Sequence, residues 1–239
     1  MIFQMKEKDK IKDMDVHPYP KSKEDIFKDI LNTINNFISN FQKKDRLEYL
    51  YEADIQASLA YELSKSIDNV ELSLHRDNPE IPRKKEKLSL ITREYPIGSR
   101  FDIACINAKT IKDYFNWRYD INEDEPIGDN TFFWELPLIA GIEIKYSPLE
   151  SNLNMGGIKS DVEKFNNYQK NYHEKRNGQD GEFTFTKDFK YLALQFYQDE
   201  IWLDKCIKKE ANGTLSQVDK FEFNDIFLIS KNKFLKYRV

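Results

Sequence analysis

A glutamate and a lysine stand one residue apart in segment 141–147 (GIEIKYS), which is otherwise apolar. The glycine and isoleucines around them predict a mostly buried β-strand. Because side chains alternate across a strand, Glu143 and Lys145 share one face, with Cα atoms roughly 6.5–7 Å apart. Burying a charged side chain costs free energy unless the charge is paired or bound to a metal. Both residues therefore need a partner or a function.

Two more carboxylates interrupt patterns that predict buried elements. Asp102 lies in the middle of the apolar run 98–106 (GSRFDIACI). Glu52 lies in a helical pattern at about 46–67 and points along its apolar stripe. That stripe consists of Ile55, Leu59, Leu63 and Ile67. We expect both carboxylates to point inward and to converge with Glu143 and Lys145 on one pocket.

Three inward carboxylates and one lysine are suited to phosphodiester hydrolysis. Hard divalent cations such as Mg²⁺ prefer carboxylate and carbonyl oxygens. A bound ion acidifies a water molecule and neutralises the charge that builds up on a phosphate. A lysine beside the ion can orient the attacking water or help to deprotonate it. This chemistry needs no histidine.

These residues resemble the PD-(D/E)XK nuclease superfamily, whose fold is restriction-endonuclease-like. The family pattern is an acidic residue near one strand, here Asp102, and Glu-x-Lys on the next, here Glu143-Ile144-Lys145. Many members also carry a glutamate in the first core helix, which Glu52 matches. The resemblance implies that Asp102 and Glu143 hold Mg²⁺, with Mn²⁺ as a substitute. The Ile144 carbonyl and Glu52, through water, would help, and Lys145 would position the attacking water.

The resemblance also implies a fold and a substrate. The family core order, α-β-β-β-α-β, corresponds to about residues 46–198, and the helix at 22–41 and the chain after about 199 would be additions. In the helix after the lysine, Asp161 and Lys164, followed by Tyr168, look like an acidic and basic pair that is frequent in the family. The implied enzyme is a Mg²⁺-dependent deoxyribonuclease, an endonuclease, with RNA as the less favoured substrate. Many relatives act as homodimers.

Each residue also has a structural interpretation. Glu143 and Lys145 would form salt bridges on a solvated sheet face. Asp102 would cap a turn, and Glu52 would bond a backbone amide or reach solvent. Asp161, in the first turn of its helix, would complement the helix dipole. Accordingly, the chain could be a catalytically inactive member of the same fold that binds nucleic acid or protein, or an unrelated α/β domain with structural ion pairs.

The order of the helices and strands expected to carry these residues predicts an α/β architecture, in which helices flank a mixed sheet. Helices are expected at 22–41, with Ser22 and Asp25 at its N-cap, at about 46–67, and at about 158–175, with a capping box of Ser160 and Glu163. Strands are expected at 88–97, 98–106, 136–147 and 191–198, and one more precedes a basic C-terminal tail. A crossover over 138–198 would make the third and fourth of these strands parallel.

The rest of the chain predicts a simple organisation. Residues 1–21 are polar and predict a flexible lead-in, followed by a single nuclease-like domain over 22–239. Residues 78–87 are loop-like. Residues 108–135 form a polar and aromatic insertion with an acidic tip, placed to influence substrate choice.

Composition bounds the class of protein. The chain has 239 residues, of which 40% are hydrophobic, enough for one domain with a sizeable core. The net charge of −4 does not by itself indicate a nucleic-acid binder, although basic patches can lie within an acidic total.

The few cysteines and histidines limit which metal and disulfide sites are expected and indicate the cellular compartment. Two cysteines without a CxxC pair argue against a structural zinc site or a disulfide framework and agree with a reducing cytosol. Three scattered histidines argue against a nuclease built on histidine and metal. No apolar run reaches the ~18 residues of a membrane span, and the charged N-terminus does not fit a signal peptide. We therefore expect a cytoplasmic protein.

Overall fold

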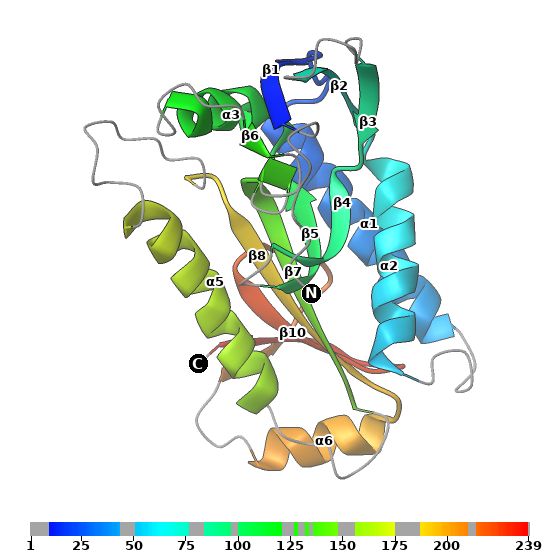
Figure 1. Ribbon diagram of the computed structural model, residues 1–239. Helices are drawn as coiled ribbons and strands as arrows, with labels where there is room; N and C mark the ends of the chain where they lie inside the picture. Colours follow the sequence, from blue (N-terminus) through cyan, green and yellow to red (C-terminus); the bar gives the residue numbers. More distant parts are fainter. Residues whose placement is uncertain are drawn as a thin grey trace.

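The computed structural model describes residues 10–43, 51–76, 84–96, 100–120, 127–128, 132–133, 136–147, 156–174, 187–209 and 214–238. Over these residues the protein has an α/β architecture with two β-sheets and flanking helices (Figure 1). The α/β class and the mixed sheet predicted from the sequence are confirmed. The division of the chain into domains stays a prediction.

The larger sheet carries the residues singled out in the sequence. In spatial order its strands are β4 (Ile91–Tyr95), β5 (Phe101–Ile106), β7 (Leu138–Ser147), β8 (Lys190–Tyr197), β10 (Asp225–Ile229), β11 (Phe234–Arg238) and β9 (Thr214–Gln217). Strand β7 is antiparallel to β5 and parallel to β8. The parallel pair confirms the crossover predicted over 138–198.

Helices cover both faces of this sheet. They are α1 (Lys23–Lys43), α2 (Glu52–Ser66), α5 (Gly156–Glu174) and α6 (Glu200–Lys209). Helix α5 packs on β7 and β8 from one side, and α2 packs on β4, β5 and β7 from the other (Figure 1). Among the described helices, none is long and apolar enough to cross a membrane.

The N-terminus of α1 confirms the predicted cap. The Asp25 backbone N–H donates to Ser22 Oγ at 3.1 Å, and the Ser22 hydroxyl donates to Asp25 Oδ2 at 2.6 Å. These bonds satisfy donors that a helix terminus leaves without an intrahelical partner. The local sequence therefore specifies where this helix begins.

A second sheet contradicts part of the predicted organisation. Its strands, in spatial order, are β3 (Lys84–Leu88), β2 (Val70–Arg76), β1 (Lys10–Val16) and β6 (Ile127–Gly128). The flexible lead-in predicted for residues 1–21 is wrong over 10–16, because β1 pairs with β2 and buries Ile11 and Met14. A register shift between Ile11 and Asp13 breaks the alternation that would have indicated a strand.

The predicted loop at 78–87 is also wrong where the structure describes it. Residues 84–87 belong to β3, an edge strand rich in lysine. Lysines on an edge strand hinder pairing with other chains, and they also make the segment look like a loop. Residues 78–83 lie outside the described residues.

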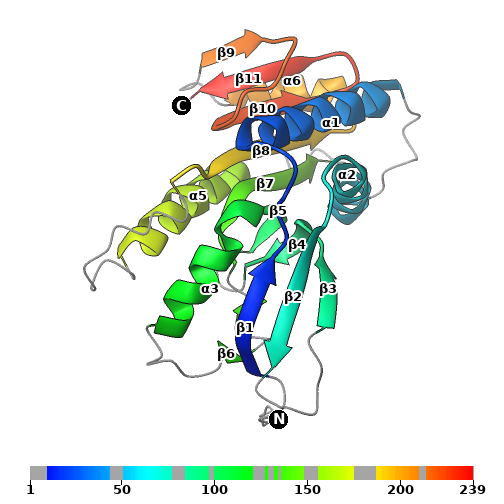
Figure 2. The same cartoon turned by 90° about the horizontal axis from the view of Figure 1, so that it is seen from above.

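The insertion predicted at 108–135 packs against this second sheet. It begins with a 3₁₀ turn (Ala108–Thr110) and α3 (Ile111–Asp120), and it includes β6. Helix α3 packs on β1, and β6 pairs with β1, so the insertion and the N-terminal strand lie together (Figure 2). The acidic tip at 122–125 lies outside the described residues.

Two further predictions need correction. Helix α5 begins at Gly156, so Ser160 and Glu163 lie inside it and form no capping box at its start. The C-terminal segment was predicted to be one strand and a basic tail. Instead, β10 and β11 form an antiparallel pair, and β9 adds to β11. The basic residue Lys236 is tolerated within the sheet because it pairs with Asp225 and Glu222.

Gly141 brings α5 close to the sheet. A Cβ at this position would lie 3.1 Å from a ring carbon of Phe165 and 3.1 Å from one of Phe189. Phe165 belongs to α5 and stacks on Phe101, with ring centroids 5.1 Å apart. Glycine therefore allows the aromatic side chains to fill the space over β7. This packing holds the first turns of α5 above Glu143 and Lys145.

Candidate active site

The residues predicted to form the site meet where β7 continues past β5. The described pairing of the two strands ends at Ile103 and Ile142. Beyond that point the Ile144 backbone N–H donates to Asp102 Oδ2 at 2.6 Å. The Tyr146 backbone N–H donates to Glu52 Oε2 at 3.1 Å.

Two carboxylates thus supply acceptors that a neighbouring strand would otherwise provide. Buried backbone donors must be paired, so this arrangement has a structural function. The alternative in which Glu52 bonds a backbone amide is confirmed. Asp102 accepts a hydrogen bond from the backbone of the neighbouring strand β7. This contact differs from the turn cap that the structural interpretation predicted. Each of these two hydrogen bonds uses one oxygen of its carboxylate, Oδ2 of Asp102 and Oε2 of Glu52.

Glu143 is the most buried charged residue of the site, with 0% of its surface exposed. Its Oε1 lies 3.3 Å from Lys164 Nζ. Its Oε2 is buried and has no hydrogen-bond partner among the described residues. Burial raises the pKa of Glu143 to about 9, and the nearby Asp102 and Asp161 add to the shift. The predicted solvated sheet face is therefore wrong, although a salt bridge does form.

Lys145 bridges the two sides of the sheet. Its Nζ lies 3.1 Å from Asp161 Oδ2 on α5 and 3.7 Å from Glu52 Oε1 at the start of α2. Burial by itself lowers the pKa of Lys145, but Glu52, Asp161 and Asp102 outweigh it, so the pKa is raised. The side chain is therefore a charged ammonium near neutral pH. It is suited to donate hydrogen bonds and not to remove a proton.

Asp161 and Lys164 belong to the same cluster but were not among the predicted site residues. Lys164 Nζ lies 2.6 Å from Asp161 Oδ1, and Asp161 is only 4% exposed. The helix-dipole interpretation of Asp161 is wrong, because α5 has no acidic residue in its first turn. The signal that could have identified both residues was the acidic and basic pair noted in the resemblance. Their burial could not be inferred from the sequence, because it depends on how α5 packs on the sheet.

The charges alternate along a continuous path. From one end to the other it consists of Glu143, Lys164, Asp161, Lys145 and Glu52. The network places a lysine beside Glu143, Asp161 and Glu52, whereas Asp102 lies outside it and adds to the raised pKa of Glu143.

A second buried acceptor lies beside this path. Gln195 on β8 is in register with Lys145. Gln195 Nε2 donates to Ser147 Oγ at 2.9 Å. Its Oε1 is buried and has no hydrogen-bond partner among the described residues. Asp161 Oδ2 is a third buried oxygen in this cluster without a hydrogen-bond partner among the described residues. Because such atoms are rare, they indicate a place for a ligand or water.

The donor set is compatible with a hard divalent cation. Within the described ranges, no three Asp, Glu, His or Cys side chains are grouped so as to hold a metal ion. The three acidic side chains of the predicted set, Glu52, Asp102 and Glu143, therefore do not form such a group, and a site made of Asp102, Glu143 and the Ile144 carbonyl, with Glu52 acting through water, stays a prediction. Burial raises the pKa of both carboxyl groups, which would favour a cation beside them. The unpartnered Glu143 Oε2 offers an oxygen ligand.

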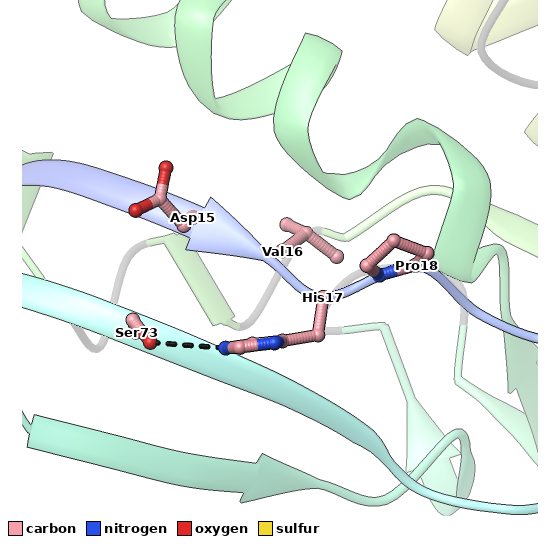
Figure 3. A pocket seen from close by; sticks show the side chains of 5 residues that line it. All are labelled: Asp15, Val16, His17, Pro18 and Ser73. Atoms are coloured by element: carbon pink, nitrogen blue, oxygen red, sulfur yellow. Dashed lines mark hydrogen bonds between the residues drawn. The ribbon is translucent and has the colours of Figure 1, made fainter.

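A pocket at the end of β1 offers a different chemistry. It is lined by Asp15, Val16, His17, Pro18 and Ser73 (Figure 3). His17 Nε2 lies 3.2 Å from Ser73 Oγ and 3.3 Å from Glu71 Oε1. In a serine triad the carboxylate bonds the other ring nitrogen. Here both contacts reach Nε2, and the Asp15 carboxylate points away from the ring (Figure 3). The pocket therefore lacks triad geometry.

Comparison with protein-family models, with curated proteins and with solved structures gives no match to this chain. A function must therefore be argued from the chemistry of the cluster around β7 and from its motif. Of the two sites described, this cluster has the stronger physical case.

Proposed function

We propose that the protein is a metal-dependent nuclease of the PD-(D/E)XK type that hydrolyses phosphodiester bonds in DNA. One observation carries the proposal: Glu52 and Asp102, both distant in sequence from the pair Glu143 and Lys145, meet that pair around the second half of β7. The order α2, β4, β5, β7, α5, β8 supports it, because it follows the family core when two sets of elements are treated as additions: β2 and β3, and the 3₁₀ turn, α3 and β6 that lie between β5 and β7.

Asp102 and Glu143 would hold Mg²⁺, with the Ile144 carbonyl and, through water, Glu52. When bound, the ion supplies an acidified water and neutralises charge on the phosphate. Strand β7 contributes Glu143 and the Ile144 carbonyl, and β5 contributes Asp102. The Ile144 N–H fixes the orientation of the Asp102 carboxylate through the 2.6 Å bond.

Lys145 would act as a hydrogen-bond donor. Its ammonium group stays charged because the surrounding carboxylates raise its pKa. It would orient the attacking water and stabilise the negative charge that develops on the phosphate oxygens. A proton acceptor would then have to be water or a substrate phosphate oxygen, because a charged ammonium cannot accept one.

A structural interpretation of the same cluster has support from the ion pairs that connect Glu143, Lys164, Asp161, Lys145 and Glu52. Replacing a buried ion pair by apolar residues is often neutral or stabilising, so stability alone is a weak reason to keep these charges. A buried carboxyl whose pKa is raised to about 9 is more typical of a functional site. An inactive relative that binds DNA or protein would keep the fold but would not cleave.

Cleavage assays separate these functions. Purified protein is incubated with supercoiled plasmid, single-stranded DNA and RNA in Mg²⁺, Mn²⁺ or EDTA. We expect plasmid cleavage with either metal and none with EDTA, and loss of cleavage in Lys145→Ala. Lys65→Ala is a matched control, because Lys65 forms an exposed ion pair with Glu62 on α2. Metal-dependent cutting by Lys145→Ala at the wild-type rate, or no cutting by wild type, would refute the proposal.

A further inference from the structure

Lys145 has two carboxylate partners that are not equivalent. Asp161 Oδ2 lies 3.1 Å from the Lys145 ammonium, and Glu52 Oε1 lies 3.7 Å away. The Asp161 side chain is 6% exposed, and that of Glu52 is 35% exposed. An ion pair strengthens as the distance falls and as water is excluded. Asp161 is therefore the closer and less exposed partner of the ammonium group.

The Asp161 carboxylate is itself held in place. Its second oxygen, Oδ1, lies 2.6 Å from Lys164 Nζ, and Lys164 also contacts Glu143 Oε1 at 3.3 Å. Both oxygens lie within ion-pair distance of a lysine, although Oδ2 forms no hydrogen bond among the described residues, so rotation of the carboxylate would lengthen at least one ion pair. Its orientation toward Lys145 is thereby fixed.

The backbone that carries Asp161 is anchored one turn later. Phe165, four residues along α5, stacks on Phe101 and on Tyr191, with ring centroids 5.1 Å and 4.3 Å apart. Gly141 leaves the space that this packing needs. A group on a packed helix positions its partner more precisely than a group on a loop does.

We propose that Asp161 is a positioning residue that holds the Lys145 ammonium beside Asp102 and Glu143. The lysine side chain has a flexible four-carbon stem, so its place depends on the group that binds its head. Without Asp161, the ammonium would move toward Glu52 and solvent, away from Glu143. The inference rests on the proposed function, since it assigns Lys145 a part in cleavage. It makes helix α5, which carries Asp161, part of the proposed active site.

The kinetic test compares Asp161→Asn with wild type and with Glu163→Gln. Glu163 is an exposed residue on the same helix and serves as the control. We expect Asp161→Asn to lower kcat by about 10- to 100-fold, as misplacement of a reacting group does. KM for DNA and the affinity for Mg²⁺ should stay close to wild type, because neither requires the ammonium in one place. Asp161→Glu, which keeps the charge, should recover part of the lost kcat.

A second measurement does not depend on activity. Metal-free protein is treated with acetic anhydride, and acetylation of each lysine is followed by mass spectrometry. In Asp161→Asn, Lys145 should react several-fold faster than in wild type, while Lys65 should react at the same rate. Melting temperatures of all variants are measured, so that loss of fold is separated from loss of position.

The outcomes distinguish the two proposals. If wild type cleaves DNA but Lys145 labelling or kcat is unchanged in Asp161→Asn, the positioning inference is overturned and the nuclease proposal stands. If wild type cleaves no nucleic acid with any metal, the nuclease proposal is overturned, and the positioning inference fails with it. Faster labelling together with a lower kcat at constant KM supports both.

Discussion

Ile144 donates its backbone N–H to Asp102 Oδ2 at 2.6 Å, so a side chain of β5 takes the place of a backbone acceptor on a neighbouring strand. The contact ties the first acidic residue of the motif to the backbone of the second part, Glu143-Ile144-Lys145. This hydrogen bond orients the Asp102 carboxylate. It also continues the hydrogen bonding of β7 beyond its last described backbone pair with β5.

This bond predicts a difference between two substitutions of Asp102. Asparagine keeps an acceptor for the Ile144 N–H, and alanine leaves this buried donor unpaired. We expect Asp102→Ala to be less stable than Asp102→Asn by about 1–3 kcal/mol, the usual cost of a buried unsatisfied group. Urea unfolding at neutral pH in EDTA measures the difference. Equal stabilities would mean that the bond contributes nothing measurable.

Burial of Glu143 predicts how stability changes with pH. Its pKa rises from an ordinary value of 4.5 to about 9 on folding. The folded state therefore binds more protons than the unfolded state between these values, and metal-free protein should lose stability as pH rises from about 4.5 to about 9. One proton gives a slope of up to about 1.4 kcal/mol per pH unit.

Glu143→Gln removes this titration. The variant should show a flatter dependence of the unfolding free energy on pH and should exceed wild type in stability near pH 8. Urea unfolding between pH 5 and 9 in EDTA provides the data. A slope identical to that of wild type would show that Glu143 does not take up a proton on folding.

Addition of a divalent cation should stabilise the protein. A ligand that binds only the folded state at 100 times its Kd adds about 2.7 kcal/mol. We expect Mg²⁺ or Ca²⁺ to raise the melting temperature of wild type and to have little effect on Glu143→Ala, which lacks a predicted ligand. Differential scanning calorimetry with metal and with EDTA measures both. A rise of equal size in wild type and variant would place the ion elsewhere.

Gly141 and Gly157 form a matched pair for testing how α5 is held. A Cβ at 141 would come within 3.1 Å of two aromatic ring carbons, whereas one at 157 would make ordinary contacts of 3.8 Å and 3.9 Å with the stem of Lys145. Gly141→Ala should therefore cost about 1–3 kcal/mol of stability through overpacking. Gly157→Ala should be neutral or slightly stabilising, because alanine favours helix.

Chemical denaturation of both glycine variants, together with their cleavage rates, completes the comparison. If α5 positions Lys145 through Asp161, Gly141→Ala should also slow cleavage, because it moves the helix. A variant that loses stability but cleaves at the wild-type rate would show that the exact distance between α5 and β7 does not matter for the reaction.

Several local features could be read from the sequence. Alternation along 141–147 correctly placed Glu143 and Lys145 on one face, and the Ser22 and Asp25 pair correctly marked the start of α1. The parallel crossover followed from chain order. These features depend on residues within a few positions of one another, or on a general rule of connection.

Other features depended on contacts between distant segments. β1 could not be recognised because its register shift breaks the alternation, and its partner β2 lies about sixty residues later. The helix expected at about 158–175 is α5 (Gly156–Glu174), but its cap was misplaced, because glycines that precede Ser160 belong to the helix.

The sequence by itself determined that Glu143 and Lys145 share one face of a strand with apolar neighbours, because side chains alternate along a strand. Only the tertiary structure decided which charges meet. Lys145 pairs with Asp161, and Glu143 pairs with Lys164, because aromatic packing over Gly141 brings one face of α5 onto β7. In the folded protein Glu143 is buried next to Asp102 and Asp161, which raises its pKa. Both effects depend on segments that are distant in the chain, so no local pattern could contain them.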